Sequence, residues 1–239
     1  MILSIIVPAY NEGSTICNVC EKIRQVHLIA DIEKEVVLIN DASSDNTEEA
    51  VFQYRERHPD LPIRYYKHTV NRGKGAAVHT GIQGATGDFV IVQDADLEYN
   101  PQEYNLLLKP ILDGFADIVY GSRFVGGKPH RVLFFWHTIG NRFLTFLSNM
   151  FTNLNLSDME TCYKLFRAEI IKSVDLRESR FGFEPEVTAK IARCRCRVSE
   201  VAVSYTVRGR DEGKKIGWKD GVRGLWCTLR YGLLPEQKG

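Results

Sequence analysis

The stretch Phe89-Val90-Ile91-Val92-Gln93-Asp94-Ala95-Asp96-Leu97-Glu98 decides the fold. A short run of β-branched and aromatic residues is typical of a buried strand, so we predict a core strand over 89–93. Three carboxylates follow it at alternate positions, and in an extended segment they would face one side. Hard carboxylate oxygens suit Mg²⁺ or Mn²⁺. The stretch therefore predicts a central strand that ends in a metal-binding turn.

Short β-branched runs alternate with helical patterns along the first half of the chain. This alternation predicts an α/β fold with a mostly parallel central sheet and helices on both faces. The expected strands are 2–7, 35–40, 63–67, 89–93 and 117–120. The expected helices are 14–26, 45–57, 75–85 and 101–112. Asp45 with Glu48 resembles a capping box, and Pro101 suits a first helical turn. A single domain with a tail is the expected organisation.

The composition excludes several classes of protein. The chain has 239 residues, of which 31 are basic and 30 acidic, so no global field favours nucleic acid. It has no run of about 18 apolar residues, so we expect no transmembrane helix. The apolar start is too short for a signal peptide, so we expect a cytoplasmic protein. Its six cysteines are expected to be reduced, buried thiols rather than metal ligands.

Polar turns that carry acidic residues follow three of the expected strands. Ligands of open parallel sheets bind beyond the carboxyl ends of the strands, so these turns should meet at one edge. An isolated Asp-x-Asp is more often a solvated turn, but this shared position favours a metal site. The turns are Pro8-Ala9-Tyr10-Asn11-Glu12, Asp41-Ala42-Ser43-Ser44-Asp45 and Asp94-Ala95-Asp96-Leu97-Glu98.

A fourth turn, Asn71-Arg72-Gly73-Lys74-Gly75, precedes a helical pattern. Its backbone amides and the start of the helix suit an anion, although a purely structural turn is also compatible. It lacks the glycine spacing of a Walker A loop. The first strand is not followed by a Gly-x-Gly-x-x-Gly motif either, which disfavours a dinucleotide oxidoreductase.

These four motifs, in this order, resemble the donor-binding half of family-2 glycosyltransferases of the GT-A fold, particularly the dolichol-phosphate (polyprenol-phosphate) mannosyltransferase-like group. The resemblance implies a GT-A domain over 1–206, then a phosphate-gating loop and C-terminal helix over 207–239. At Asn40-Asp41-Ala42-Ser43 the chain departs from the more familiar Asp-Asp-Gly-Ser, so the base and sugar stay open. The resemblance continues through Gly121-Ser122-Arg123, Asp158-Met159-Glu160-Thr161-Cys162-Tyr163-Lys164, Gly182-Phe183-Glu184 and 208–215.

The resemblance also implies residue roles. Mg²⁺ or Mn²⁺ would be held by Asp94, Asp96 and Glu98. The nucleotide sugar would be bound by Pro8, Tyr10, Glu12, Asp41, Ser43, Lys74, Asp94, Lys214 and Lys215. Catalysis would involve Asp96, Arg123, Asp158 and Arg208. The Gln-x-x-Arg-Trp element of processive synthases is missing, which favours the transfer of a single sugar.

One further feature is independent of the resemblance: no acidic residue lies between Ile118 and Ser157. Basic and aromatic residues interleave there, which suits a membrane surface, and we predict that Arg131 and Arg142 bind the acceptor phosphate. An ordinary core helix and an oligomer interface stay open as alternatives. A second basic cluster over 190–197 is predicted to be a solvated face.

The preferred function is inverting transfer of one sugar, mannose or glucose, from a GDP- or UDP-sugar to polyprenyl phosphate. The enzyme would act at the cytoplasmic face of the membrane, with a membrane-protein partner as an option. A phosphate acceptor needs no strong base, whereas a hydroxyl acceptor would need Asp158, Glu160 or Glu184. The alternatives are transfer to a glycan hydroxyl and a non-catalytic nucleotide-sugar sensor. A nucleotidyltransferase is disfavoured because no basic, glycine-rich loop follows the first strand.

Overall fold

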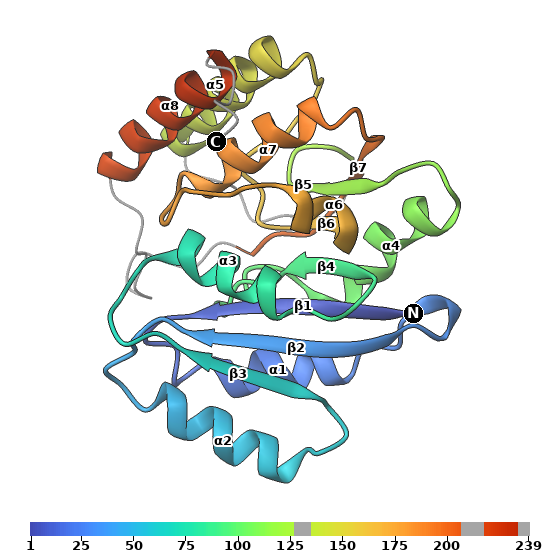
Figure 1. Ribbon diagram of the computed structural model, residues 1–239, viewed down its shortest axis with the longest axis vertical. Helices are drawn as coiled ribbons and strands as arrows, with labels where there is room; N and C mark the ends of the chain where they lie inside the picture. Colours follow the sequence, from blue (N-terminus) through green and yellow to red (C-terminus); the bar gives the residue numbers. More distant parts are fainter. Residues whose placement is uncertain (127–134, 207–217, 234–239) are drawn as a thin grey trace.

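The computed structural model describes residues 1–126, 135–206 and 218–233, which form one seven-stranded sheet flanked by helices (Figure 1). The strand order is β3-β2-β1-β4-β6-β5-β7. The strands are β1 (Ile2–Ala9), β2 (Glu33–Asn40), β3 (Ile63–Lys67), β4 (Phe89–Val92), β5 (Ile118–Ser122), β6 (Lys164–Arg167) and β7 (Val198–Ala202). The α-helices are α1 (Ile16–Arg24), α2 (Thr47–Arg57), α3 (Lys74–Gly84), α4 (Tyr104–Leu112), α5 (Phe135–Thr152), α6 (Ala168–Ser173), α7 (Phe183–Arg193) and α8 (Trp218–Leu233).

The sheet is mostly parallel, as predicted, and β6 is its antiparallel member. In the register, β6 lies between β4 and β5, with Leu165 opposite both Ile91 and Val119. The other pairs, β1–β2, β1–β4, β2–β3 and β5–β7, are parallel. Consequently the carboxyl ends of six strands and the start of β6 share one edge of the sheet.

The burial of the parallel strands on both faces explains why they could be predicted from the sequence. Every residue from Leu3 to Val7 is buried, because helices cover both faces of a parallel sheet. In Figure 1, α3 lies in front of the sheet and α1 behind it, which confirms the predicted layers. Gly81 of α3 allows the closest approach, since a Cβ there would lie 2.4 Å from the Cγ2 atom of Ile6.

The helix ends agree with the predictions except in one detail. The Asp45 carboxylate accepts a hydrogen bond from the backbone N–H of Thr47 (3.0 Å) at the start of α2. Glu48 does not complete a capping box, because its side chain pairs with Lys67 on β3. Pro101 begins a short 3₁₀ helix (Pro101–Glu103) ahead of α4, as expected for a first turn.

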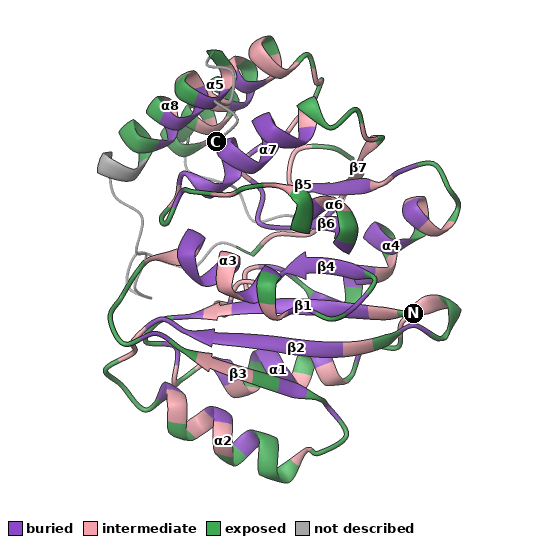
Figure 2. Cartoon of the chain, in the orientation of Figure 1, coloured by how far each residue is buried: buried purple, intermediate pink, exposed green. Residues whose placement is uncertain are grey.

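Three helices pack together beside β5 and β7. Helix α7 is buried from Phe183 to Ile191, because α5 and α8 cover it (Figure 2). The predicted solvated basic face is therefore wrong for Lys190, which is only 4% exposed and pairs with Glu186 at 2.8 Å.

No helix in the described ranges is long and apolar enough to cross a membrane. The cysteines are free thiols, with Cys20 and Cys227 buried and Cys194 exposed.

Candidate active site

The carboxyl ends of β1, β2 and β4 meet at one edge of the sheet, on the left in Figure 1. We call this edge the rim. It consists of the loops that follow these strands, the turn that precedes α3, and the segment that enters β6. In residue numbers the rim is 8–13, 41–46, 71–75, 94–98 and 158–163.

The first two rim loops are joined by hydrogen bonds. The backbone N–H of Asn11 donates to the Ser43 hydroxyl (2.9 Å), and the N–H of Ser44 donates to the Asn11 side chain (2.8 Å). Asn11 and Ala42 both have left-handed backbones, with φ of 54° and 60°. Among the residues predicted to bind the nucleotide, Ser43 therefore also links the two loops. The Tyr10 ring is exposed on the rim.

Two further predicted nucleotide ligands of this region, Glu12 and Pro8, are held within the protein. Glu12 is buried and accepts a hydrogen bond from the Thr15 hydroxyl (2.8 Å). Pro8 lies within β1, opposite Ile39 of β2. The two loops therefore present a fixed surface at the ends of β1 and β2, where we predicted the nucleotide.

Asp41 organises the fourth motif of the rim. Its two carboxylate oxygens accept hydrogen bonds from the backbone N–H groups of Arg72 (2.9 Å) and Gly73 (2.7 Å). The buried His68 ring lies 2.6 Å from the same carboxylate and also contacts the hydroxyl of Thr80 on α3 (2.9 Å). Asp41 thus fixes the 71–73 turn, a role that the resemblance did not suggest.

The glycines of this turn are needed for backbone conformation and close packing. Gly73 has φ 92°, a region that favours glycine. A Cβ at Gly75 would lie 2.2 Å from the carbonyl oxygen of Glu178. The backbone N–H of Ala76 donates to the carbonyl of Ser179 (3.0 Å). The turn before α3 is therefore held from both sides, by Asp41 and by residues 178–179.

Lys74 connects this turn to the acidic turn after β4. Its ammonium lies 2.8 Å from an Asp94 carboxylate oxygen and 3.5 Å from a carboxylate oxygen of Glu184 on α7. Burial acts against the charge, but the two carboxylates outweigh it and raise the pKa of Lys74 well above its ordinary value. Lys74 is therefore a fixed cation at the place where we predicted phosphate.

The acidic turn is not the extended segment that the alternation suggested. Leu97 has φ 62°, which bends the chain between Asp96 and Glu98. The Tyr205 hydroxyl donates to Glu98 (2.5 Å), and the backbone N–H of Glu98 donates to Asp96 (3.2 Å). The expectation that all three carboxylates face one side was therefore wrong in geometry. The metal-binding roles of Asp94, Asp96 and Glu98 stay predictions.

The donor atoms at this turn fit a hard divalent cation. Asp94 and Asp96 offer carboxylate oxygens, and Mg²⁺ is commonly held by one or two carboxylates together with substrate phosphates. Among the described residues, no three His, Cys, Asp or Glu side chains gather into a metal-binding group. We infer that Asp94 and Asp96 would hold the ion jointly with a diphosphate.

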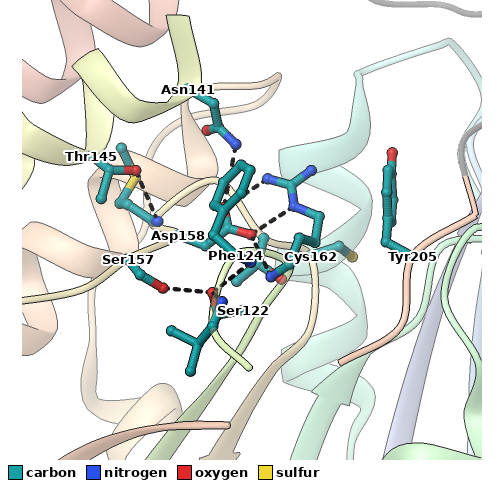
Figure 3. Close-up of polar contacts among 12 residues, drawn as sticks. Ser122, Phe124, Asn141, Thr145, Ser157, Asp158, Cys162 and Tyr205 are labelled. Carbon is teal, nitrogen blue, oxygen red and sulfur yellow. Dashed lines mark hydrogen bonds and ion pairs between the residues drawn. The ribbon is translucent and has the colours of Figure 1, made fainter. Parts of the chain in front are cut away.

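On the β5 and β6 side, an ion pair dominates the site (Figure 3). Two nitrogens of Arg123 donate to the two carboxylate oxygens of the fully buried Asp158, Nε at 2.6 Å and Nη2 at 2.7 Å. Asn141 of α5 also donates to Asp158 (3.3 Å). The Arg123 guanidinium lies 5.1 Å from the ring centre of Tyr205. Arg123 is thus a rigidly placed cation, as suits phosphate recognition.

The three carboxylates considered as bases differ in their surroundings. Asp158 is held by Arg123, and Glu184 faces Lys74. Glu160 has a buried carboxylate oxygen without a hydrogen-bond partner among the described residues. Burial, followed by the nearby Glu184, raises the pKa of Glu160 to about 7.

Some predicted residues lie outside the described ranges: Arg131, Arg208, Lys214 and Lys215. Arg142 is described, and its guanidinium lies 5.6 Å from the ring centre of Phe124. Sequence reasoning missed His68, Asn141 and Tyr205. Only His68 carried a signal, because it directly follows β3 as the other motifs follow their strands.

Comparisons with known proteins identify the family and the fold. The family model for glycosyl transferase family 2 matches residues 4–175. The chain belongs to this family.

Two curated relatives are polyprenyl-phosphate mannosyltransferases by name. A dolichol-phosphate mannosyltransferase from Pyrococcus furiosus is 27% identical over 91% of this chain, which spans only 60% of that protein. An undecaprenyl-phosphate mannosyltransferase from Micrococcus luteus is 28% identical over 98% of this chain and 95% of its own length.

Solved structures share the fold and were determined with metal and nucleotide. A glucosyl-3-phosphoglycerate synthase from Mycobacterium tuberculosis, solved with Mn²⁺, UDP and phosphoglyceric acid, superimposes with a TM-score of 0.74. It is 17% identical, over 99% of this chain and 80% of its own. A mannosyltransferase from Pyrobaculum calidifontis, solved with GDP-mannose and Mn²⁺, has a TM-score of 0.63 at 24% identity, over 87% and 57%. These likenesses establish the GT-A fold.

Proposed function

We propose that this protein is an inverting glycosyltransferase that moves one sugar, mannose or glucose, from a GDP- or UDP-sugar to polyprenyl phosphate. It would act at the cytoplasmic face of a membrane. The names of the two relatives support this acceptor. The observation that carries the proposal is structural: α5 contributes a side chain to the site and exposes an apolar face on its other side.

We use the name apolar face for the exposed hydrophobic side chains of α5 and α8, two helices that pack against each other. On α5 these residues are three or four apart from Trp136 onward, so they share one stripe of the helix. Figure 2 shows exposed residues along both helices. Exposed aromatic side chains of this kind suit the headgroup region of a bilayer. The face consists of Phe135, Trp136, Ile139, Phe143, Phe146 and Met150 on α5, and Val222, Trp226 and Leu233 on α8.

Helix α5 reaches the Arg123–Asp158 pair with one side and carries its part of the apolar face on the other. Asn141 reaches Asp158, while the next residue, Arg142, lies against Phe124. No carboxylate on α5 would repel an anionic lipid headgroup. A polyprenyl phosphate whose chain lies in the membrane would therefore bring its phosphate to the cationic end of the site.

The chemistry follows from where the charges are fixed. A bound Mg²⁺ or Mn²⁺ would offset charge on the nucleotide diphosphate. Lys74, at the start of α3, would bind the diphosphate from the nucleotide side. Arg123 would bind acceptor phosphate, with Asp158 holding its guanidinium in place. A phosphate oxygen is already anionic, so its attack on the anomeric carbon requires no strong base.

The experiment is a screen of UDP- and GDP-sugars with Mn²⁺ or Mg²⁺, using polyprenyl phosphate and neutral polyprenol as paired acceptors. We expect a glycosylated polyprenyl phosphate, detected by mass, and nucleoside diphosphate as the second product. Transfer to polyprenol or to a glycan alone would favour the hydroxyl-acceptor rival. Donor binding without any turnover would favour the sensor.

A further inference from the structure

Glu160 is the rim carboxylate whose hydrogen bonding is incomplete. Its buried Oε1 atom has no hydrogen-bond partner among the described residues. The carboxylates of Asp94 and Asp158, by contrast, are held by Lys74 and Arg123. A buried acceptor left without a donor costs roughly 1–3 kcal/mol. A hydroxyl group supplied by a ligand would satisfy this oxygen.

The strand order places Glu160 next along the rim, after the predicted nucleotide loops and the acidic turn. The predicted nucleotide loops follow β1 and β2, the acidic turn follows β4, and β6 is the next strand. Glu160 lies four residues before the start of β6, at the same edge. From β2 to β6 there are three strand spacings of about 4.8 Å, or about 14 Å in all. Nucleotide, diphosphate and sugar would then follow one another along the rim.

Charged groups from several elements surround Glu160. Glu184 of α7 and Asp158 make its ionisation less favourable, whereas Lys164 of β6 and Arg123, beyond β5, favour it. Burial acts first and strongest, so the pKa of Glu160 rises to about 7. With this pKa about half of the carboxyl groups are protonated at pH 7, and the protonated form both donates and accepts a hydrogen bond, as a sugar hydroxyl also does. It also does not repel the adjacent diphosphate.

We propose that Glu160 hydrogen-bonds one hydroxyl of the transferred sugar and so helps to determine which sugar the enzyme accepts. The inference rests on the proposed donor but not on the proposed acceptor. A site built to bond a hydroxyl discriminates against the analogue that lacks it, because its own polar group is then left unpaired.

The test is a cycle that combines a protein substitution with a substrate deletion. Donor binding with Mn²⁺ is measured by calorimetry, and kcat/KM for donor hydrolysis in parallel, for the preferred nucleotide sugar and its monodeoxy analogues. We expect the native protein to bind one deoxy analogue roughly 10- to 100-fold more weakly than the parent donor, with a matching fall in kcat/KM. Glu160→Ala should bind the parent donor more weakly by a similar factor. The variant should bind that analogue no more weakly than it binds the parent donor. Glu169→Gln, an exposed carboxylate on α6, is the matched control.

Glu160→Gln keeps the shape and both hydrogen-bonding functions, so it should retain most donor binding. The proposal would be overturned if each deoxy analogue lost the same factor of affinity in the native protein as in Glu160→Ala. So would loss of turnover in Glu160→Gln at unchanged donor affinity, since that is the behaviour of a general base. If no nucleotide sugar binds the native protein, this inference and the proposed function both fail. If the donor binds and turns over, but the effect of removing a sugar hydroxyl does not depend on Glu160, only this inference fails.

Discussion

The two sides of the rim are built in different ways. On the β1, β2 and α3 side, loops are joined to one another by short hydrogen bonds, such as those from the 72–73 backbone to Asp41. On the β5 and β6 side, the site depends on the Arg123–Asp158 pair and on α5, whose other face exposes Trp136 (77%) and Phe146 (63%). On the first side, the loops are held by hydrogen bonds within the protein. The second leaves apolar surface for something else to cover.

This difference separates two kinds of recognition. A prearranged polar surface suits a soluble, highly charged donor, because the protein groups need little rearrangement when it binds. An exposed apolar face on the same helix that reaches the Arg123–Asp158 pair suits an amphipathic acceptor, whose phosphate and chain are recognised separately. Substitutions on the two sides should therefore affect different steps.

The largest effect is expected from Asp96→Asn. Removing one hard ligand weakens the hold on metal and diphosphate together, so both transfer and donor hydrolysis should fall by about 100-fold or more. Steady-state rates with saturating Mn²⁺ measure this, and circular dichroism checks the fold. Asp60→Asn, at an exposed position, is the control. Full activity in excess chelator would contradict the metal assignment.

A smaller and more selective effect is expected from the double substitution Trp136→Ser, Phe143→Ser. Binding to vesicles that contain anionic lipid, and transfer to polyprenyl phosphate in those vesicles, should fall by about tenfold because aromatic anchors are lost. Donor hydrolysis without lipid should be unchanged. Phe115→Ser removes an equally exposed ring outside the apolar face and should change neither. If instead the double variant changes a dimer to a monomer in light scattering, the face is an oligomer interface.

The pH dependence of stability should reveal Glu160. Its pKa is raised from 4.5 to about 7 in the folded protein, so its ionisation disfavours the fold. The native protein should lose this increment of stability as pH rises from about 4.5 to about 7, the window between the two values. Glu160→Gln should not, so its melting temperature should exceed that of the native protein more at pH 8 than at pH 5. Parallel melting curves at both pH values would contradict the raised pKa.

The smallest effect concerns Ala42, which stands where the resembled family more often has glycine. Its φ of 60° is unfavourable for a residue with a Cβ, by about 1–2 kcal/mol. Glycine would remove this strain but add disorder to the unfolded chain, which offsets part of the gain. Ala42→Gly should therefore raise the free energy of unfolding by about 0.5–1 kcal/mol in urea titrations. Ala50→Gly, inside helix α2, should lower it.

The donor side could be predicted from the sequence because its signals are local. The strands β1, β2 and β4 read as apolar runs, and parallel strands bring the turns after them to one edge without further information. The pairing of Asp41 with the 72–73 backbone could not be predicted, because it joins segments about thirty residues apart.

The other side depends on long-range order. Strand β6 is only four residues long, and its antiparallel insertion brings Asp158 and Glu160 to the rim. For the stretch without acidic residues, the sequence suggested a membrane surface and left a core helix open; the structure places α5 there, with its aromatic side chains largely exposed. Nothing in the sequence indicated that α8 would pack beside α5, because that depends on the contacts of α8 with α5 and α7.

The most direct test of the account compares two rates in one vesicle preparation: sugar transfer to polyprenyl phosphate and donor hydrolysis, each in native protein and in Arg142→Gln. The account predicts that Arg142→Gln slows lipid glycosylation several-fold more than hydrolysis, because Arg142 lies on the acceptor side next to Asn141. Arg195→Gln, an exposed arginine beyond α7, should leave both rates unchanged. Equal slowing of both rates in Arg142→Gln, or no transfer to polyprenyl phosphate with any donor, would contradict it.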